Sequence, residues 1–522
     1  MLERQFSPLP RLLAGVAAVS ITVLLMAGPG TAAGEKSSRE TPYVTADDPW
    51  YQAGQAALQE RLALRPNTNR AKNIILFVAD GMGISTITAT RIFDGQSRGE
   101  SGEENVLSFE RFPYTALVKT YNSNAQVPDS AGTASALNTG VKTRIGVIGT
   151  PAGVRNGDCA ASLNGHPANM GELARKAGKS VGVVSTSLIV DATPAAVYAH
   201  SPSRGWMFDS RMPDASKAAG CKDIALQMLE FGPEVALGGG RVAFYPAGTA
   251  SPENSAESGA RADGRDLTSE WTSTLENAAY VWNSAGFDAV DLAMTDHLLG
   301  LFERATMQYE ADRANDAGGE PSLTEMTRAA LEILSRNENG YYLMVEGGRV
   351  DHAHHAGNAY RALTDTQVFA DAVQAAVDMV DLEETLILVT ADHSHVFTIA
   401  GYPARGNPIL GLVKSVDDSG EPEADPELAE DGKPYTTLGY WNGPGAITGA
   451  RPDLSDVDTT ALDYIQQSIV PTRSETHGGE DVALFATGPW AHLVSGVMEQ
   501  NVVFHIMAHA MGFDKATGQD EK

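Results

Sequence analysis

The sequence predicts an α/β protein, a three-layer α/β/α sandwich with a central, mostly parallel sheet. The chain has 522 residues, of which 43% are hydrophobic, enough for one large α/β domain with insertions. Short runs rich in Val, Ile and Leu recur along it, and segments with helical periodicity separate these runs. Strands that are apolar throughout are typical of parallel sheets with helices on both faces.

Five apolar runs predict the buried strands of this sheet. They are "KNIILFVADGMG" (72–83), "KSVGVVSTS" (179–187), "GYYLMVEGG" (340–348), "TLILVTADHSH" (385–395) and "EDVALFATG" (480–488). Helices are expected over "DPWYQAGQAALQERLAL" (48–64), "MGELARKAG" (170–178) and "SLTEMTRAALEILSR" (322–336).

The N-terminal 33 residues are typical of a signal peptide. Arg4 and Arg11 form a basic region, "LLAGVAAVSITVLLMAG" is the apolar region, and small residues suit cleavage near Ala33. The alternative is a transmembrane anchor, for which the apolar run is short and interrupted by Gly15. We therefore expect an exported protein, periplasmic or secreted, without a stable membrane anchor.

The mature chain is expected to hold a leader with an N-terminal helix (34–70) and one large domain (71–522). Two segments interrupt the alternation of strands and helices in that domain. Residues 247–275 are polar and rich in Gly, Ser and Glu. Residues 414–460 begin with the acidic tract "SVDDSGEPEADPELAEDGKP" and continue with aromatic and Gly-rich stretches. Both are expected to be insertions into the main domain.

Charge and cysteine content narrow the function classes. The formal net charge of −28 argues against nucleic acid or an anionic membrane as a partner, since both require a basic face. An anionic substrate would also be repelled unless local cations reversed the field. The two cysteines, Cys159 and Cys221, are expected to pair as a disulfide in an oxidising compartment. Two separate buried thiols are the alternative.

Carboxylates and imidazoles follow several of the predicted strands, where ligands bind in open α/β sheets. These strand-end residues are Asp80, Thr193, Glu346, Asp351, Asp392, His393 and His477. Asp351 and His355 are four residues apart, so on a helix they share one face and can bind one ion. Two His/Asp sets suit Zn²⁺, and the all-oxygen set of Asp80, Thr193 and Glu346 suits Mg²⁺. The sequence therefore predicts a site with several metal ions.

Ser130, in "VPDSAGTASALNTG", is a candidate nucleophile exposed at the start of a helix of small residues. A serine hydroxyl needs a base or a metal ion to lose its proton. The next histidine along the chain, His166, is far away in sequence, but a neighbouring zinc ion makes a histidine base unnecessary.

These motifs resemble the alkaline phosphatase family over nearly the whole mature chain. The similar segments are "PDSAGTASA", "DATPAAVYAH", "VEGGRVDHAHH", "VTADHSHVFTIAGYPARGN" and "THGGED", and several look closer to animal members than to bacterial ones. The resemblance implies the family's fold, with the insertion at 414–460 as a smaller crown-like region. It also implies hydrolysis of phosphate monoesters by a homodimer.

The resemblance assigns the site residue by residue. Ser130 would be the phosphorylated nucleophile. One zinc ion would take Asp351, His355 and His477, the other Asp80, Asp392 and His393, and magnesium Asp80, Thr193 and Glu346. Arg204, in "AHSPSRGW", falls where the family binds phosphate, and Asp191 and His352 fall at two variable positions near the third metal and the substrate. The Cys159–Cys221 spacing resembles a disulfide of the animal enzymes.

A calcium ion is a further implication of the resemblance. Phe302, through its carbonyl, and Glu303 resemble the animal calcium site, and Glu320 and Glu253 are the candidates for its remaining ligands. The alternative is a solvated acidic loop.

Two other functions remain open from the sequence. A related phosphodiesterase or sulfatase would share the metal ligands, and an exported phosphate- or metal-binding protein without turnover would explain them as well. Neither accounts for Ser130 together with the third ligand set and Arg204.

Overall fold

The computed structural model describes residues 48–513, and the chain divides after Ala63 into two compact units. In the first, helix α1 (Pro49–Ala63) confirms the helix expected over 48–64, and none of its side chains is buried. The predicted signal peptide lies outside the described residues. Among residues 48–513, no helix combines the length and hydrophobicity needed to cross a membrane.

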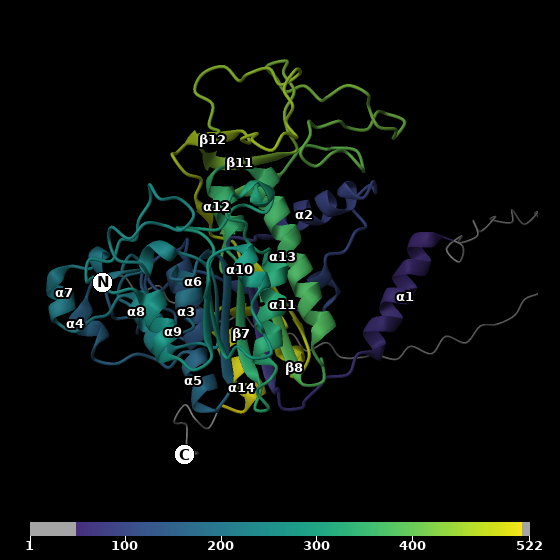
Figure 1. Cartoon of the computed structure of the whole chain (residues 1–522). Helices are drawn as coiled ribbons and strands as arrows, with labels where there is room; N and C mark the ends of the chain where they lie inside the picture. Colours follow the sequence, from purple (N-terminus) through teal and green to yellow (C-terminus); the bar gives the residue numbers. More distant parts are fainter. Residues whose placement is uncertain (1–47, 514–522) are drawn as a thin grey trace, which may run out of the picture. The chain divides into compact units, whose positions relative to one another are not determined.

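The second unit is built on a ten-stranded sheet of order β15-β2-β14-β8-β1-β7-β3-β4-β6-β5 (Figure 1). The strands are, in this order, Gly496–Glu499, Tyr114–Lys119, Val482–Thr487, Thr385–Thr390, Asn73–Ala79, Tyr341–Gly347, Ser180–Leu188, Val235–Gly239, His297–Leu301 and Ala278–Val281. Among the described strands of this sheet, only β14 runs antiparallel to the others. The predicted fold class is confirmed, as are all five predicted strands.

Register at the centre of this sheet aligns the strand ends. Val78 of β1 lies opposite Glu346 of β7 and Thr390 of β8, and Ser185 of β3 lies opposite Glu346. Asp80 lies two residues after Val78, and Asp392 lies two residues after Thr390, which pairs with Val78. The two carboxylates therefore lie at the same level beyond the ends of β1 and β8. The apolar residues of β1, β7 and β8 are buried, which fixes this register.

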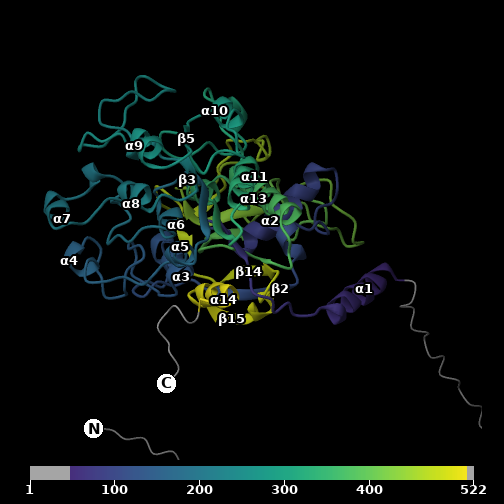
Figure 2. The ribbon, with the colours of Figure 1, turned by 60° about the horizontal axis from the view of Figure 1, so that its bottom comes forward.

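Helices cover both faces of the sheet (Figures 1 and 2). On one face α11 (Leu323–Leu334) and α13 (Ala359–Met379) pack against the central strands. On the other lie α3 (Ser130–Thr139), α5 (Met170–Lys176), α6 (Ala192–Ala195) and α14 (Val502–Met511). The three-layer arrangement predicted from the sequence is therefore present.

The remaining elements are shorter or lie outside these layers. The helices are α2 (Ile84–Ser97), α4 (Cys159–Ser162), α7 (Asp214–Ala218), α8 (Ile224–Phe231), α9 (Leu267–Thr274), α10 (Ser284–Asp288) and α12 (Arg349–His355). The 3-10 turns are η1 (Ser108–Arg111), η2 (Asp209–Arg211), η3 (Arg241–Ala243), η4 (Arg313–Asn315) and η5 (Ala491–Leu493). Strands β9 (Ser394–His395) and β13 (His477–Gly478) form an antiparallel pair.

The segment 414–460 belongs to a separate small region at the top of Figure 1. Its strand β11 (Leu438–Gly443) lies between β10 (Phe397–Ile399) and β12 (Ser468–Pro471) in a three-stranded sheet. The acidic tract itself is loop with isolated bridges.

The segment 247–275 is loop over most of its length but ends in helix α9. Asp266 starts this helix by accepting hydrogen bonds from the backbone N–H groups of Thr268 and Ser269. Trp271 of α9 is fully buried. One buried aromatic residue thus anchors a segment whose composition predicts only loop.

Two further contacts fix this side of the molecule. The predicted disulfide is present between Cys159 and Cys221, 62 residues apart. Arg261, 1% exposed, binds both carboxylate oxygens of Asp223 at 3.0 and 3.1 Å and also pairs with Asp263. Since Asp223 also caps α8, Arg261 ties the polar segment to the domain core.

We predict that Arg261→Met destabilises the protein strongly, because it leaves the Asp223 carboxylate buried without its partner. The expected loss of unfolding free energy is about 3–5 kcal/mol. Thermal unfolding at fixed metal concentration measures it. The matched control is Arg98→Met, whose ion pair with Asp94 is half exposed and is worth about 1 kcal/mol or less. Equal shifts in melting temperature for the two variants would contradict the role of Arg261.

Candidate metal centre and nucleophile

Three ligand sets meet at the carboxyl ends of the central strands. Asp80 follows β1, Glu346 lies in β7, and Asp392 and His393 follow β8. Helix α12, directly after β7, carries Asp351 and His355, and His477 lies in β13. Parallel strands aligned in register bring these distant residues together, as the strand-end pattern predicts.

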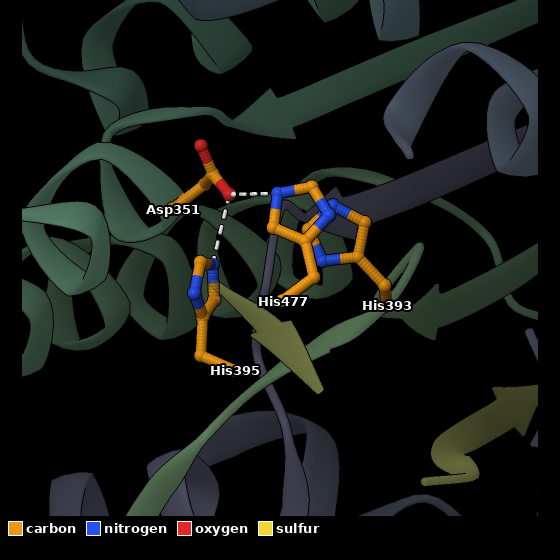
Figure 3. A group of neighbouring side chains, drawn as sticks. All are labelled: Asp351, His393, His395 and His477. Carbon is orange, nitrogen blue, oxygen red and sulfur yellow. Dashed lines mark hydrogen bonds and ion pairs between the residues drawn. The ribbon is translucent and has the colours of Figure 1, made fainter. Parts of the chain in front are cut away.

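The first set consists of Asp351, His355 and His477. Asp351 Oδ1 lies 3.4 Å from His355 Nε2 and 3.4 Å from His477 Nε2, and the two histidine nitrogens lie 3.1 Å apart. Figure 3 shows Asp351 facing His477. The nitrogens and the carboxylate oxygen converge on one point, a donor set suited to Zn²⁺.

His395 is a neighbour of this set that sequence reasoning did not assign. Its Nε2 lies 2.8 Å from Asp351 Oδ1, and its Nδ1 contacts the Glu475 carboxylate (Figure 3). Burial favours the neutral ring, but the two carboxylates raise the pKa of His395 to about 9. His395 therefore donates to Asp351 and orients it. Its position two residues after His393, on the same side of an extended segment, was the available signal.

The second set consists of Asp80, Asp392 and His393, and Ser130 lies against it. His393 Nε2 is 3.3 Å from Asp80 Oδ1, 3.4 Å from Asp392 Oδ2 and 3.2 Å from Ser130 Oγ. The backbone N–H of Gly81 and the hydroxyl of Thr133 donate to Asp392 and fix its orientation.

Ser130 is the first residue of α3, as expected, but it is not exposed. Only 3% of its surface is accessible, and its Oγ lies 3.2 Å from His393 Nε2. The sequence expectation of an exposed serine is therefore wrong in this detail. Asp129 caps α3 by accepting from the Gly132 N–H, and Ser130 lies at the N-terminus of this helix, where a helix favours negative charge.

The third set consists of Asp80, Thr193 and Glu346. Asp80 Oδ1 and Thr193 Oγ1 are buried and make no hydrogen bond among the described residues, although His393 Nε2 lies 3.3 Å from Asp80 Oδ1. Ser185 Oγ donates to Glu346 Oε2. Buried polar atoms without partners are rare, and oxygen donors of this kind fit a hard cation such as Mg²⁺. The residues present thus fit the ions that the sequence predicts.

The buried carboxylates repel one another in the absence of cations. Burial, followed by the charges of Asp392, Asp351 and Glu346, raises the pKa of Asp80 well above its ordinary value. Burial is also the main cause that raises the pKa of Glu346 to about 8. Divalent cations between these groups would remove the repulsion, so the centre is built for bound metal.

Arg204 lies beside the nucleophile, held by two carboxylates. Its Nη1 is 3.3 Å from Asp129 Oδ2 and its Nη2 is 3.0 Å from Asp191 Oδ1. One third of the side chain is accessible, so the guanidinium can contact a ligand. His352, which the Arg349 guanidinium contacts at 3.2 Å, has its pKa lowered mainly by burial.

A separate acidic group matches part of the predicted calcium set. Carboxylate oxygens of Glu253, Glu303 and Asp316 lie within 4.8 Å of one another. Asp316 follows the turn η4 and was not named from the sequence, whereas Glu320 lies beside the group and accepts from the Gln308 N–H at 2.8 Å. Phe302 precedes Glu303 and is buried.

The same group contains a cation of the chain itself. Arg241, 1% exposed, contacts Glu253 through Nη2, and that nitrogen lies 4.0 Å from Glu303 Oε2. Since Arg241 carries one positive charge and the group holds three carboxyl groups, the carboxylates outnumber the cation in this group.

We predict that Glu346→Gln flattens the pH dependence of stability of the metal-free protein. The pKa of Glu346 is about 8 in the fold and about 4.3 in the unfolded chain. The folded state therefore keeps a proton that the unfolded chain releases, and the unfolding free energy falls as pH rises from about 5 to about 8. Glutamine removes this contribution, so near pH 8 the metal-free variant melts at a higher temperature than metal-free wild type.

Melting temperatures after exhaustive chelation test this expectation. The control is Glu338→Gln, an exposed residue in the loop before β7. If melting temperature depends on pH in the same way for metal-free wild type and metal-free Glu346→Gln, the raised pKa of Glu346 is refuted.

Comparison with known proteins agrees with this geometry. The family model "Alkaline phosphatase" matches residues 71–513. The tissue-nonspecific isozyme of Gallus gallus is 46% identical over 88% of this chain and 88% of its own, and the Gadus morhua alkaline phosphatase is 44% identical over 88% and 96%.

Solved structures of alkaline phosphatases have the same fold. That of Thermus thermophilus has a TM-score of 0.60 at 25% identity and covers 88% of this chain and 94% of its own. That of the Antarctic bacterium TAB5 has a TM-score of 0.57 at 23% identity and covers 85% and 99%. With a family model matched over most of its length, this chain belongs to the alkaline phosphatase family.

Proposed function

We propose that the chain hydrolyses phosphate monoesters through a phosphoserine intermediate on Ser130. The observation that carries this proposal is the contact of Ser130 Oγ, 3.2 Å from His393 Nε2, with a metal-ligand set at the N-terminus of α3. Membership of the alkaline phosphatase family supports the same reaction.

The three ligand sets are proposed to hold two zinc ions and one magnesium ion. Zinc would use Asp351, His355 and His477 in one set and Asp80, Asp392 and His393 in the other. Magnesium would use Asp80, Thr193 and Glu346. When bound, such ions supply positive charge that stabilises the entering and leaving oxygens of phosphoryl transfer.

The protein's own residues supply the nucleophile and hold the phosphoryl group in place. Ser130 Oγ forms the bond to phosphorus while the bond from phosphorus to the ester oxygen breaks, and the proton that Ser130 loses is balanced by the one that the leaving alcohol gains. A water molecule then attacks the phosphoserine and releases inorganic phosphate. Arg204 can hold two phosphoryl oxygens with its fork of N–H groups. Asp129 and Asp191 keep that fork aimed, because each binds one of its terminal nitrogens.

Asp191 and His352 would tune substrate binding. Asp191 binds Arg204 directly at 3.0 Å, so its first role is to orient the arginine. Burial keeps the pKa of His352 low, so this imidazole is neutral at alkaline pH and can contact the phosphate as a hydrogen-bond partner.

Calcium and export complete the proposal. The acidic group of Glu253, Glu303 and Asp316, next to Phe302 and Glu320, has the oxygen donors that Ca²⁺ prefers. The Cys159–Cys221 disulfide is typical of an oxidising compartment, in keeping with removal of a signal peptide and a periplasmic or secreted location.

Ser130→Ala is expected to lower the hydrolysis of an aryl phosphate by about a thousandfold or more, because a water molecule replaces the nucleophile poorly. The variant should keep its metals, since Ser130 is not in any ligand set. Metal analysis of wild type should give at least two zinc ions and one magnesium ion per chain, with calcium as an additional ion. Labelled phosphate, trapped in acid, should lie on Ser130.

Two outcomes of these assays would count against the proposal. Labelled phosphate on a different residue, or none at all, removes the serine mechanism. Faster hydrolysis of a bis-aryl phosphate or an aryl sulfate than of the aryl phosphate would favour the related phosphodiesterase or sulfatase. Release of phosphate at catalytic protein concentration excludes a binding protein without turnover.

We also propose that the chain forms a homodimer. Large apolar side chains are exposed on the small three-stranded region and next to it: Tyr402 is 88% accessible, Trp441 57% and Ile469 67%. Exposed groups of this kind are typical of an interaction surface.

The expected result in sedimentation velocity at micromolar concentration is a dimer. Trp441→Arg should shift the distribution toward monomer, whereas Leu163→Arg, an exposed substitution far from this segment in sequence, should not. A wild-type monomer at these concentrations would refute the proposal.

A further inference from the structure

A second kind of metal-ligand group lies outside the centre described above. His166, Glu172 and His200 bring two imidazole nitrogens and one carboxylate oxygen within 4.8 Å of one another. Glu172 lies in the first turn of α5, His166 in the loop before it, and His200 follows α6. Three segments of the chain thus contribute one ligand each.

A cavity of about 300 Å³ opens beside this group. Its lining includes His166 and His200 together with Ser162, Cys221, Lys222 and Glu230. A ligand bound to the histidines would therefore be in contact with solvent. The group thus lies at the wall of a cavity and not in the buried core or on a flat part of the surface.

Hydrogen bonds fix the tautomer of His200. Its Nδ1 lies 2.6 Å from the carbonyl oxygen of Gly149, and a carbonyl oxygen only accepts, so Nδ1 carries the proton. The neutral ring then presents a lone pair at Nε2. Asn169 Nδ2 faces this nitrogen at 3.4 Å, as a donor would, since Asn169 Oδ1 accepts from the Glu172 N–H.

Glu172 faces the same lone pair. Its Oε1 lies 3.1 Å from His200 Nε2, while its Oε2 accepts from the Asn169 N–H at 3.0 Å. An ionised carboxylate and an unprotonated nitrogen both offer lone pairs, which repel at this distance unless a cation lies between them. A proton or a metal ion can fill that role.

His166 supplies a further nitrogen, which favours the metal. Its ring stacks on that of His200 with centroids 3.5 Å apart. Because His166 is exposed and lies in a loop, its side chain can turn a nitrogen toward the gap without moving the backbone. Two imidazoles and one carboxylate match the ligands of borderline divalent ions and leave a coordination position open.

We propose that His166, Glu172 and His200 form an additional metal site for a borderline divalent cation, Zn²⁺ in the first instance, with its open position facing the cavity. The site is separate from the three ligand sets around Ser130 and does not depend on their assignment. Mg²⁺ and Ca²⁺ are not expected to compete, because two of the three donors are imidazoles.

Zinc titration of the metal-loaded enzyme by calorimetry, with Mg²⁺ and Ca²⁺ in excess, tests the site. Wild type is expected to bind one zinc ion per chain beyond the catalytic set. His166→Ala should weaken this binding by about tenfold or more while leaving basal hydrolysis unchanged. Glu172→Gln keeps the capping contact to Asn169 but loses the charge, and should weaken the binding as well.

The matched control is His505→Ala, which removes an exposed histidine from α14. Its isotherm should coincide with that of wild type. The proposal is overturned if wild type binds no zinc beyond the catalytic set, in which case a proton bridges His200 and Glu172. It is equally overturned if His166→Ala and wild type bind the additional zinc with the same affinity.

Discussion

The mutual repulsion of buried carboxylates is the constraint on which the rest of the structure depends. Asp80, Asp351, Asp392 and Glu346 are buried within one small volume, and burial with neighbouring charges raises the pKa of Asp80 and Glu346. Protons or divalent cations among these groups relieve the repulsion. Divalent cations bound there would also reverse the local field of a protein of formal charge −28, which would make this centre attractive to an anionic substrate.

The sheet is what holds these charges against their repulsion. Aligned register of β1, β7 and β8 fixes the levels at which Asp80, Glu346 and Asp392 leave the strands. Contacts around the ligands then fix their orientation: His395 donates to Asp351, and Thr133 donates to Asp392. The apolar strands thus position the metal-ligand sets.

The main strands and most ligands could be predicted because apolar runs and strand-end carboxylates are local patterns. Five strands of the main sheet were not predicted. Strands β4, β5, β6 and β15 have only four or five residues, and β2 alternates buried and exposed residues. Helix α9 was missed because it depends on the burial of Trp271 against the rest of the domain. His395 stands beside assigned residues, but its role needs Glu475, which lies 80 residues away. Asp316 lies with Glu253 and Glu303 in the acidic group although the sequence did not predict it, because a turn in a loop places it there and loop conformation is weakly encoded in local composition.

Asp80 stands in both the second and the third ligand set, and this sharing has a thermodynamic consequence. On the proposed assignment one carboxylate faces two cations, so each cation changes the electrostatic environment that the other meets. Two such binding equilibria are linked, and the linkage is reciprocal. If occupancy of one set changes the affinity of the other set by some factor, occupancy of the other set changes the affinity of the first by the same factor. The two sets therefore bind their ions as a coupled pair. The apparent affinity of each set is defined only at a stated concentration of the ion that binds the other set.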